Sequence, residues 1–178
     1  MKIIEFSTKQ TENPVHFMET GFPDSNVQEW KGMTVFGEFL PDGSLHPMTL
    51  RLLAKAREMA GDQNDKAQIL LIGDGLTESG KQYFSNGADR IFIYDDPSLA
   101  NAGPLSYTGI LAHFIDNFKP AAMLFAGTPL GRILIANILE YARSVVDEIK
   151  DSEGQTELPP VILNSDQKGE LVICEIPA

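Results

Sequence analysis

Apolar segments that alternate with helical patterns limit what this chain can fold into. Four short apolar runs are typical of strands buried on both faces, at residues 33–39, 68–72, 90–94 and 123–126. Helical patterns follow them at residues 47–60, 77–85, 104–118 and 129–150. Strands separated by single helices form a parallel sheet that helices cover on both faces. The sequence therefore predicts a three-layer α/β/α domain with a mostly parallel sheet.

The two ends of the chain are less regular. Residues 2–6 suit a short strand, and Pro14, Gly21 and Pro23 mark a loop after it. We expect residues 1–29 to be an extension, either an added strand or a tail, and residues 30–178 to be the domain proper. Apolar residues on both sides of a polar turn at 166–169 predict a closing β-hairpin over residues 161–176.

Composition excludes several classes of partner. The 178 residues have a formal net charge of −11, which disfavours nucleic acid and anionic membranes as partners. The one cysteine, Cys174, cannot form an intrachain disulfide, which favours a reducing compartment. The sequence has no secretory signal pattern and no apolar run long enough to span a membrane. We expect a cytoplasmic protein without membrane insertion.

The end of the fourth apolar run is the first place to look for function. The run stops at Gly127, and Thr128 is a good N-cap for the helix that follows. Pro129 suits the first helical position, where its missing N–H removes no hydrogen bond. This strand–turn–helix step lies at the carboxyl edge of the predicted sheet, where open α/β proteins bind ligands.

A second polar residue is expected at the same edge. Glu38 lies at the end of the first predicted strand, and both ends meet at a topological switch point if the strands at 33–39 and 123–126 are neighbours. The candidate cofactor-binding residues are Glu38, Gly127, Thr128, Gly131 and Arg132. They either bind a ligand or only fix the turn.

Other chemical motifs are incomplete. Residues 75–82 have the spacing of a phosphate-binding P-loop, but Gln82 stands where that loop needs Ser or Thr, so an ordinary strand–helix connection is favoured. Asp95 and Asp96 precede Pro97, and we interpret them as turn and cap residues rather than a catalytic pair. No metal-ligand spacing and no serine-hydrolase elbow is present, so we expect no metal site and no catalytic residues.

Several stretches, in one order and spacing, resemble the alpha subunit of electron transfer flavoprotein. The resemblance covers roughly residues 30 to 138. In the first half it comprises Trp30–Glu38, Asp42-Gly43 and residues 46–58, which begin with His46-Pro47. In the second half it comprises residues 87–93, which begin with Gly87-Ala88-Asp89, then Asp95-Asp96-Pro97, Lys119-Pro120, and residues 123–132, which end in Gly127-Thr128-Pro129-Leu130-Gly131-Arg132.

The resemblance implies an N-terminal domain of that alpha subunit, with a Rossmann-like fold related to adenine-nucleotide-binding domains. Such a domain packs against a similarly folded beta subunit and performs no bond-breaking chemistry. The family's FAD, which passes electrons between dehydrogenases and an acceptor, is bound by a separate C-terminal domain. We expect that domain to be absent from this chain and the chain to hold no cofactor itself.

Two positions depart from the family pattern. Ile133 and Asn137 stand where the family usually has an acidic and a basic residue.

An alternative function is a stand-alone domain that binds or senses an adenine nucleotide in the same crevice. An ATP-using transferase or hydrolase is a third possibility, and it lacks an intact phosphate loop.

Overall fold

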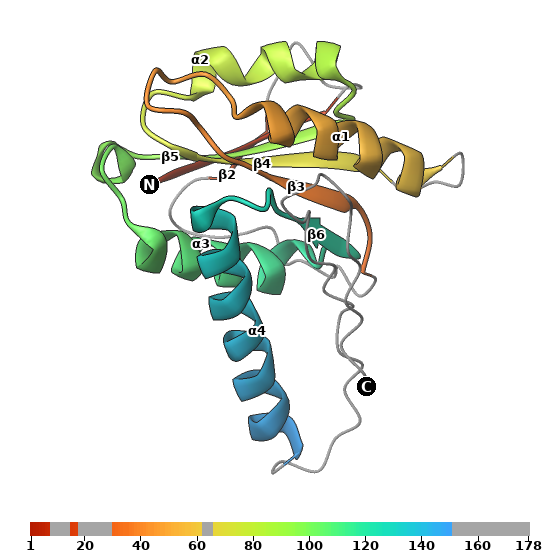
Figure 1. Cartoon of the computed structure of the whole chain (residues 1–178), viewed down its shortest axis with the longest axis vertical. Coiled ribbons are helices and arrows are strands. Elements are labelled where there is room, and N and C mark those ends of the chain that lie inside the picture. The colour runs from red at the N-terminus through yellow and green to blue at the C-terminus, as the bar shows by residue number, and fades with distance from the viewer. Residues whose placement is uncertain (8–14, 18–29, 62–65, 151–178) are drawn as a thin grey trace.

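Six strands form one sheet in the order β2-β1-β5-β4-β3-β6 (Figure 1). The computed structural model describes residues 1–7, 15–17, 30–61 and 66–150. Their strands are β1 (Lys2–Ser7), β2 (Val15–Phe17), β3 (Met33–Gly37), β4 (Ala67–Gly73), β5 (Arg90–Asp95) and β6 (Ala122–Leu124). The pairs β3–β4, β4–β5 and β3–β6 are parallel, as the sequence predicts.

The N-terminal segment adds antiparallel strands to one side of this sheet. β1 pairs with β5 from Lys2 opposite Asp95 to Ser7 opposite Arg90, and β2 pairs with the outer side of β1. Of the two alternatives for this segment, an added strand is therefore the correct one for residues 2–7.

Helices cover both faces of the sheet, which confirms the three-layer prediction. They are α1 (Pro47–Ala60), α2 (Thr77–Gly80), η1 (Lys81–Asn86), η2 (Pro97–Leu99), α3 (Pro104–Phe118) and α4 (Pro129–Lys150). Figure 1 shows α1 and α2 on one face and α3 with α4 on the other, where α4 extends away from the sheet.

Some boundaries differ from those predicted. The helix expected at 77–85 is a single α-helical turn that continues as the 3₁₀ helix η1. The first predicted strand ends at Gly37, because the chain turns back and Phe39 pairs with Leu45 instead. β6 ends at Leu124 rather than at residue 126. The hairpin expected at 161–176 lies outside the described residues.

Side chains that alternate along the strands build a separate core on each face. Phe36, Leu70 and Phe92 pack with α3 and α4, whereas Val35 and Ile69 belong to the core beneath α1. Burial on both faces explains why the central strands are mostly apolar. Thr34 and Gln68 are buried polar exceptions, and the Thr34 hydroxyl donates to the Gln68 side-chain oxygen at 2.9 Å.

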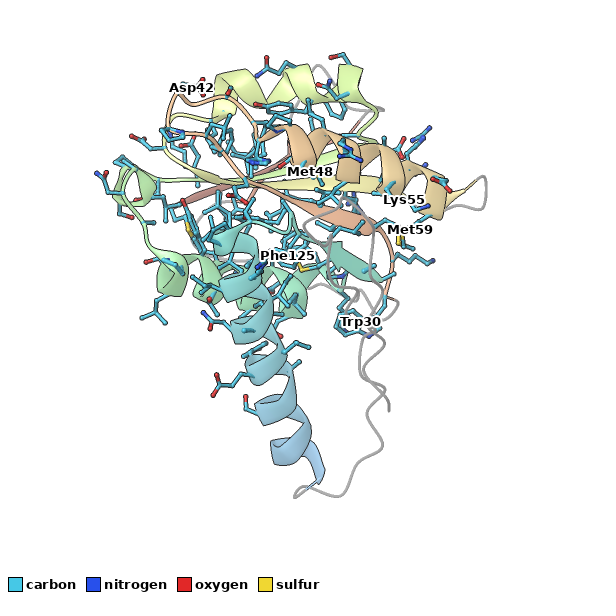
Figure 2. All side chains as sticks on the ribbon, viewed as in Figure 1. Trp30, Asp42, Met48, Lys55, Met59 and Phe125 are labelled. Carbon is cyan, nitrogen blue, oxygen red and sulfur yellow. The ribbon has the colours of Figure 1, made fainter. Side chains whose placement is uncertain are left out.

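The amino ends and the carboxyl ends of the parallel strands lie at opposite sides of the sheet. Figure 2 shows Trp30, which precedes β3, well apart from Asp42, which lies in the loop after β3. Side chains that follow the parallel strands therefore gather at one edge, the carboxyl edge.

Candidate functional site

The sheet order brings the ends of β3 and β6 together. The two strands pair in parallel, with Thr34 opposite Met123 and Val35 opposite Leu124. After β3 the chain enters α1 on one face, and after β6 it enters α4 on the other (Figure 1). The boundary between β3 and β6 is thus a topological switch point, the usual ligand position of such sheets.

A relay of two hydrogen bonds joins Glu38 to the start of α4. The Thr128 hydroxyl donates to Glu38 Oε2 at 2.6 Å and accepts from the Gly131 N–H at 3.0 Å. Thr128 is therefore the N-cap of α4, as the Thr-Pro pair predicts. The same hydroxyl holds a carboxylate from a residue 90 positions earlier in front of the positive end of the helix.

Gly131 allows this helix to start close to the end of β6. A Cβ atom at Gly131 would lie 1.9 Å from the main-chain oxygen of Ala126. Only glycine permits the first turn of α4 to fold back onto the strand end this closely.

The other two candidate residues have different surroundings. Gly127 is half-buried in the turn itself. Arg132 donates its N–H to the Thr128 carbonyl at 3.0 Å, and its side chain is exposed. The structure thus joins Glu38, Thr128 and Gly131 in one contact network and leaves the Arg132 side chain at the surface.

The main chain of Glu38 is also held in place, by residues at the start of α1. Its N–H donates to the Thr49 hydroxyl at 3.3 Å, and its carbonyl accepts from the His46 N–H at 2.8 Å. The Nδ1 atom of His46 accepts the Met48 N–H at 3.2 Å and caps α1. Thr49 is fully buried, and sequence reasoning missed it, although a threonine in the first turn of an amphipathic helix is a usable signal.

Tyr107 is the second group that sequence reasoning missed. It lies on α3, and its ring meets Phe36 edge-on at a centroid distance of 6.0 Å. Burial raises the pKa of the Tyr107 phenol, and the Glu38 charge raises it further. Its spacing on α3 indicated a core residue and nothing more.

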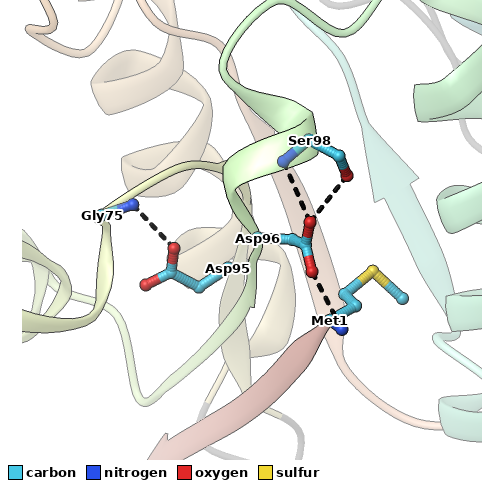
Figure 3. Close-up of polar contacts among 5 residues, drawn as sticks. All are labelled: Met1, Gly75, Asp95, Asp96 and Ser98. Atoms are coloured by element: carbon cyan, nitrogen blue, oxygen red, sulfur yellow. Dashed lines mark hydrogen bonds and ion pairs between the residues drawn. The ribbon is translucent and has the colours of Figure 1, made fainter.

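Two further carboxylates lie at the same edge of the sheet (Figure 3). Asp95, at the end of β5, accepts the Gly75 N–H at 2.7 Å and the Thr77 N–H at 3.0 Å, together with the Thr77 hydroxyl. Asp96 accepts the Ser98 N–H and hydroxyl and pairs with the N-terminal amine at 2.9 Å. The prediction that this pair serves turns and caps is confirmed.

The P-loop spacing at residues 75–82 corresponds to an ordinary connection. α2 begins at Thr77, so Lys81 opens the helical segment η1 instead of ending a phosphate loop. The turn uses its N–H groups to bind Asp95, a side chain of the domain itself.

Within residues 1–7, 15–17, 30–61 and 66–150, no three His, Cys, Asp or Glu side chains gather as a metal site would require. No helix in this part of the chain is both long and apolar enough to cross a membrane.

Comparisons with known proteins point to one family. Residues 34–140 match the family described as "Electron transfer flavoprotein domain". The chain is 32% identical over 115 residues to "Lactate dehydrogenase (NAD(+),ferredoxin) subunit LctC" of Acetobacterium woodii, which is 65% of this chain and 27% of that protein. It is 30% identical over 118 residues to "Electron transfer flavoprotein subunit alpha" of Megasphaera elsdenii, covering 65% of this chain and 35% of that protein.

A third relative covers a slightly larger part of the chain. "Protein FixB" of Rhizobium meliloti is 30% identical over 129 residues, or 68% of this chain and 35% of that protein. The matched part thus spans between 27% and 35% of the length of these three relatives.

Proposed function

The chain belongs to the electron transfer flavoprotein family, and on this premise we propose that it is the N-terminal domain of an alpha-type subunit that supports assembly. In this proposal it packs against a beta subunit and positions a FAD-binding domain for electron transfer between dehydrogenases and an acceptor. The family match over residues 34–140 supports the first part, because it runs from the start of β3 to the middle of α4.

The observation that favours a supporting role is the relay at the switch point. Glu38, Thr128 and Gly131 satisfy one another by hydrogen bonds of 2.6 and 3.0 Å. Polar groups of a ligand site are free to form hydrogen bonds with the ligand. The polar groups of these three residues already form hydrogen bonds with one another. We therefore propose that Glu38, Thr128 and Gly131 fix the junction of β3, β6 and α4.

We infer that the start of α4 is a poor site for the pyrophosphate of FAD. The pyrophosphate of a dinucleotide needs free N–H donors at a helix start. At α4 the Gly131 N–H is bonded to Thr128, and Glu38 places a negative charge beside it. We accordingly propose that the family's flavin is held by a separate domain, as the sequence resemblance implies.

The proposal includes no bond-breaking step in this domain. The carboxylates at the edge, Glu38, Asp95 and Asp96, each accept hydrogen bonds from turns or caps of the fold. Groups used in this way stabilise backbone rather than transfer protons to a substrate.

Co-expression with the beta-type subunit of the same organism tests the proposal. We expect a one-to-one complex in size-exclusion chromatography with light scattering, and the purified 19.6 kDa chain alone to show no flavin absorbance. The chain mixed with an unrelated acidic α/β protein serves as the control for nonspecific association.

Two results would contradict the proposal. The first is a chain that stays separate from the beta subunit under every salt condition. The second is a stoichiometric flavin spectrum from the isolated chain, which would mean that its own residues hold the cofactor.

A further inference from the structure

We infer that the carboxyl edge of this domain excludes phosphate-bearing ligands, and that the Glu38 carboxylate is the specificity-determining group. The inference goes beyond the proposed assembly role, because it concerns which small molecules the fold accepts. It rests on two strand–helix turns, one of them with P-loop spacing, that each bind a carboxylate of the domain itself.

The start of α4 has few donors left for an anion. Phosphates bind at helix starts through the free N–H groups of the first turn. Pro129, the first residue of α4, has no N–H, and the Gly131 N–H already donates to the Thr128 hydroxyl. Two of the N–H groups that a helix start ordinarily offers are thus unavailable.

The charge of Glu38 opposes an incoming phosphate at the same place. Its Oε2 atom lies 2.6 Å from the Thr128 hydroxyl, directly before the helix start. The side chain is half-buried, so water screens its charge less than at an open surface. Burial raises the pKa of Tyr107, on the neighbouring helix α3, and the Glu38 charge raises it further.

The turn between β4 and α2 repeats the arrangement. Its Gly75 and Thr77 N–H groups point at Asp95 and bond it at 2.7 and 3.0 Å, as Figure 3 shows for Gly75. In a P-loop the corresponding N–H groups surround a phosphate. Here the anion is a side chain of β5, so the turn is complete without a ligand.

Titration with inorganic pyrophosphate and with AMP tests the inference, read from the backbone amide signals of the isotope-labelled chain. In the wild-type protein we expect no saturable change in the signals of residues 127–132 or 74–77 at millimolar ligand. This part of the test does not depend on the folding of any variant.

The variant Glu38→Gln tests which group is responsible. Its amide oxygen still accepts the Thr128 hydroxyl, while the negative charge is lost. We expect its affinity for pyrophosphate at residues 127–132 to be at least tenfold higher than that of the wild type. Glu58→Gln is the matched control, because Glu58 is exposed on α1 and its removal changes the net charge equally. Circular dichroism and amide dispersion establish that both variants are folded.

Two outcomes would overturn the inference. Saturable AMP or pyrophosphate binding by the wild type at residues 127–132 would show that the edge accepts phosphate. A folded Glu38→Gln variant that behaves like the wild type and Glu58→Gln would show that this carboxylate does not decide the exclusion. Neither result bears on beta-subunit binding, so failure here and failure of the proposed function are separate.

Discussion

One main-chain oxygen explains why residue 131 is a glycine. The Ala126 carbonyl oxygen lies where a Cβ atom of residue 131 would be, at 1.9 Å. The obstacle is backbone rather than a flexible side chain, so it cannot move without shifting the end of β6. Gly109, in the interior of α3, is the opposite case, because it is exposed and nothing lies within 4 Å of its Cβ position.

Alanine substitutions at these two helical glycines should therefore change stability in opposite directions. We expect Gly131→Ala to lower the free energy of unfolding by about 2–3 kcal/mol, as overpacking against a rigid neighbour does. We expect Gly109→Ala to raise it by about 0.5–1 kcal/mol, because alanine lowers the entropy lost in a helix. Urea unfolding followed by circular dichroism measures both. A Gly131→Ala protein as stable as the wild type would contradict the close contact.

α4 is attached to the domain along its first half by polar contacts with α3. Asn137 Nδ2 donates to the Thr108 hydroxyl at 2.9 Å, and the Tyr141 hydroxyl donates to Asp116 at 2.6 Å. Asn137 is one of the two positions that depart from the family's charge pattern, and here it bonds within the chain. The other, Ile133, is 45% exposed and adds an apolar side chain to the surface.

A double-mutant cycle measures how strongly Asn137 holds α4 to α3. We expect Asn137→Ala and Thr108→Val to show a coupling energy of about 1 kcal/mol in urea unfolding, the usual value for a side-chain hydrogen bond. Thr108→Val keeps the side-chain volume, so the cycle reports the hydrogen bond rather than a cavity.

Lys55→Ala, on α1 across the sheet, provides the control for that cycle. Combined with Thr108→Val it should be additive within about 0.5 kcal/mol, because the two sites share no partner. Additivity of Asn137→Ala with Thr108→Val would mean that their contact contributes nothing to the position of α4.

A contact between the sheet and α3 should make the stability of the entire domain depend on pH. Tyr94 is fully buried on β5, and its hydroxyl lies 3.0 Å from His113 Nδ1. Burial lowers the pKa of His113, while the Asp116 carboxylate one turn along the helix opposes this shift. The neutral imidazole is thus the form that the folded protein prefers.

The lowered pKa of His113 gives a signed prediction. An unfolded histidine takes up its proton near pH 6.5, before the folded one does. Stability should therefore be full above about pH 6.5 and fall as the pH decreases toward the lowered native pKa. His113→Gln, which keeps an acceptor for Tyr94, should show a flatter dependence of the unfolding free energy between neutral and mildly acidic pH.

Two carboxylates with lowered pKa values, Asp42 and Asp96, act in a separate pH range from His113. Hydrogen bonds from Ser44 and Ser98 lower the pKa values of Asp42 and Asp96, so their contribution is lost only below about pH 4. Identical profiles for the wild type and His113→Gln above that range would contradict the assignment to His113.

The sequence determined the elements and the fold class, because those follow from local patterns. The periodicity and the proline and glycine positions predicted α1 and α3 with their observed bounds, and Thr128-Pro129 predicted the cap of α4. The helix expected at 77–85 covers nearly the observed helical range, but only its first turn is α-helical. Gly80 packs directly on Ile93, and the change from α2 to the 3₁₀ helix η1 follows it. A tertiary contact of this kind has no signal in the local sequence.

Only the tertiary structure decided what the candidate residues do. Whether Glu38 meets Thr128 depends on β3 lying beside β6, a pairing between segments about half the chain apart that no local pattern encodes. The same holds for Asp95, whose role depends on the turn that β4 places next to it. Residue types and spacing identified where polar groups gather. The order of strands determined that these groups bind one another, because hydrogen bonds form between atoms that folding brings within reach.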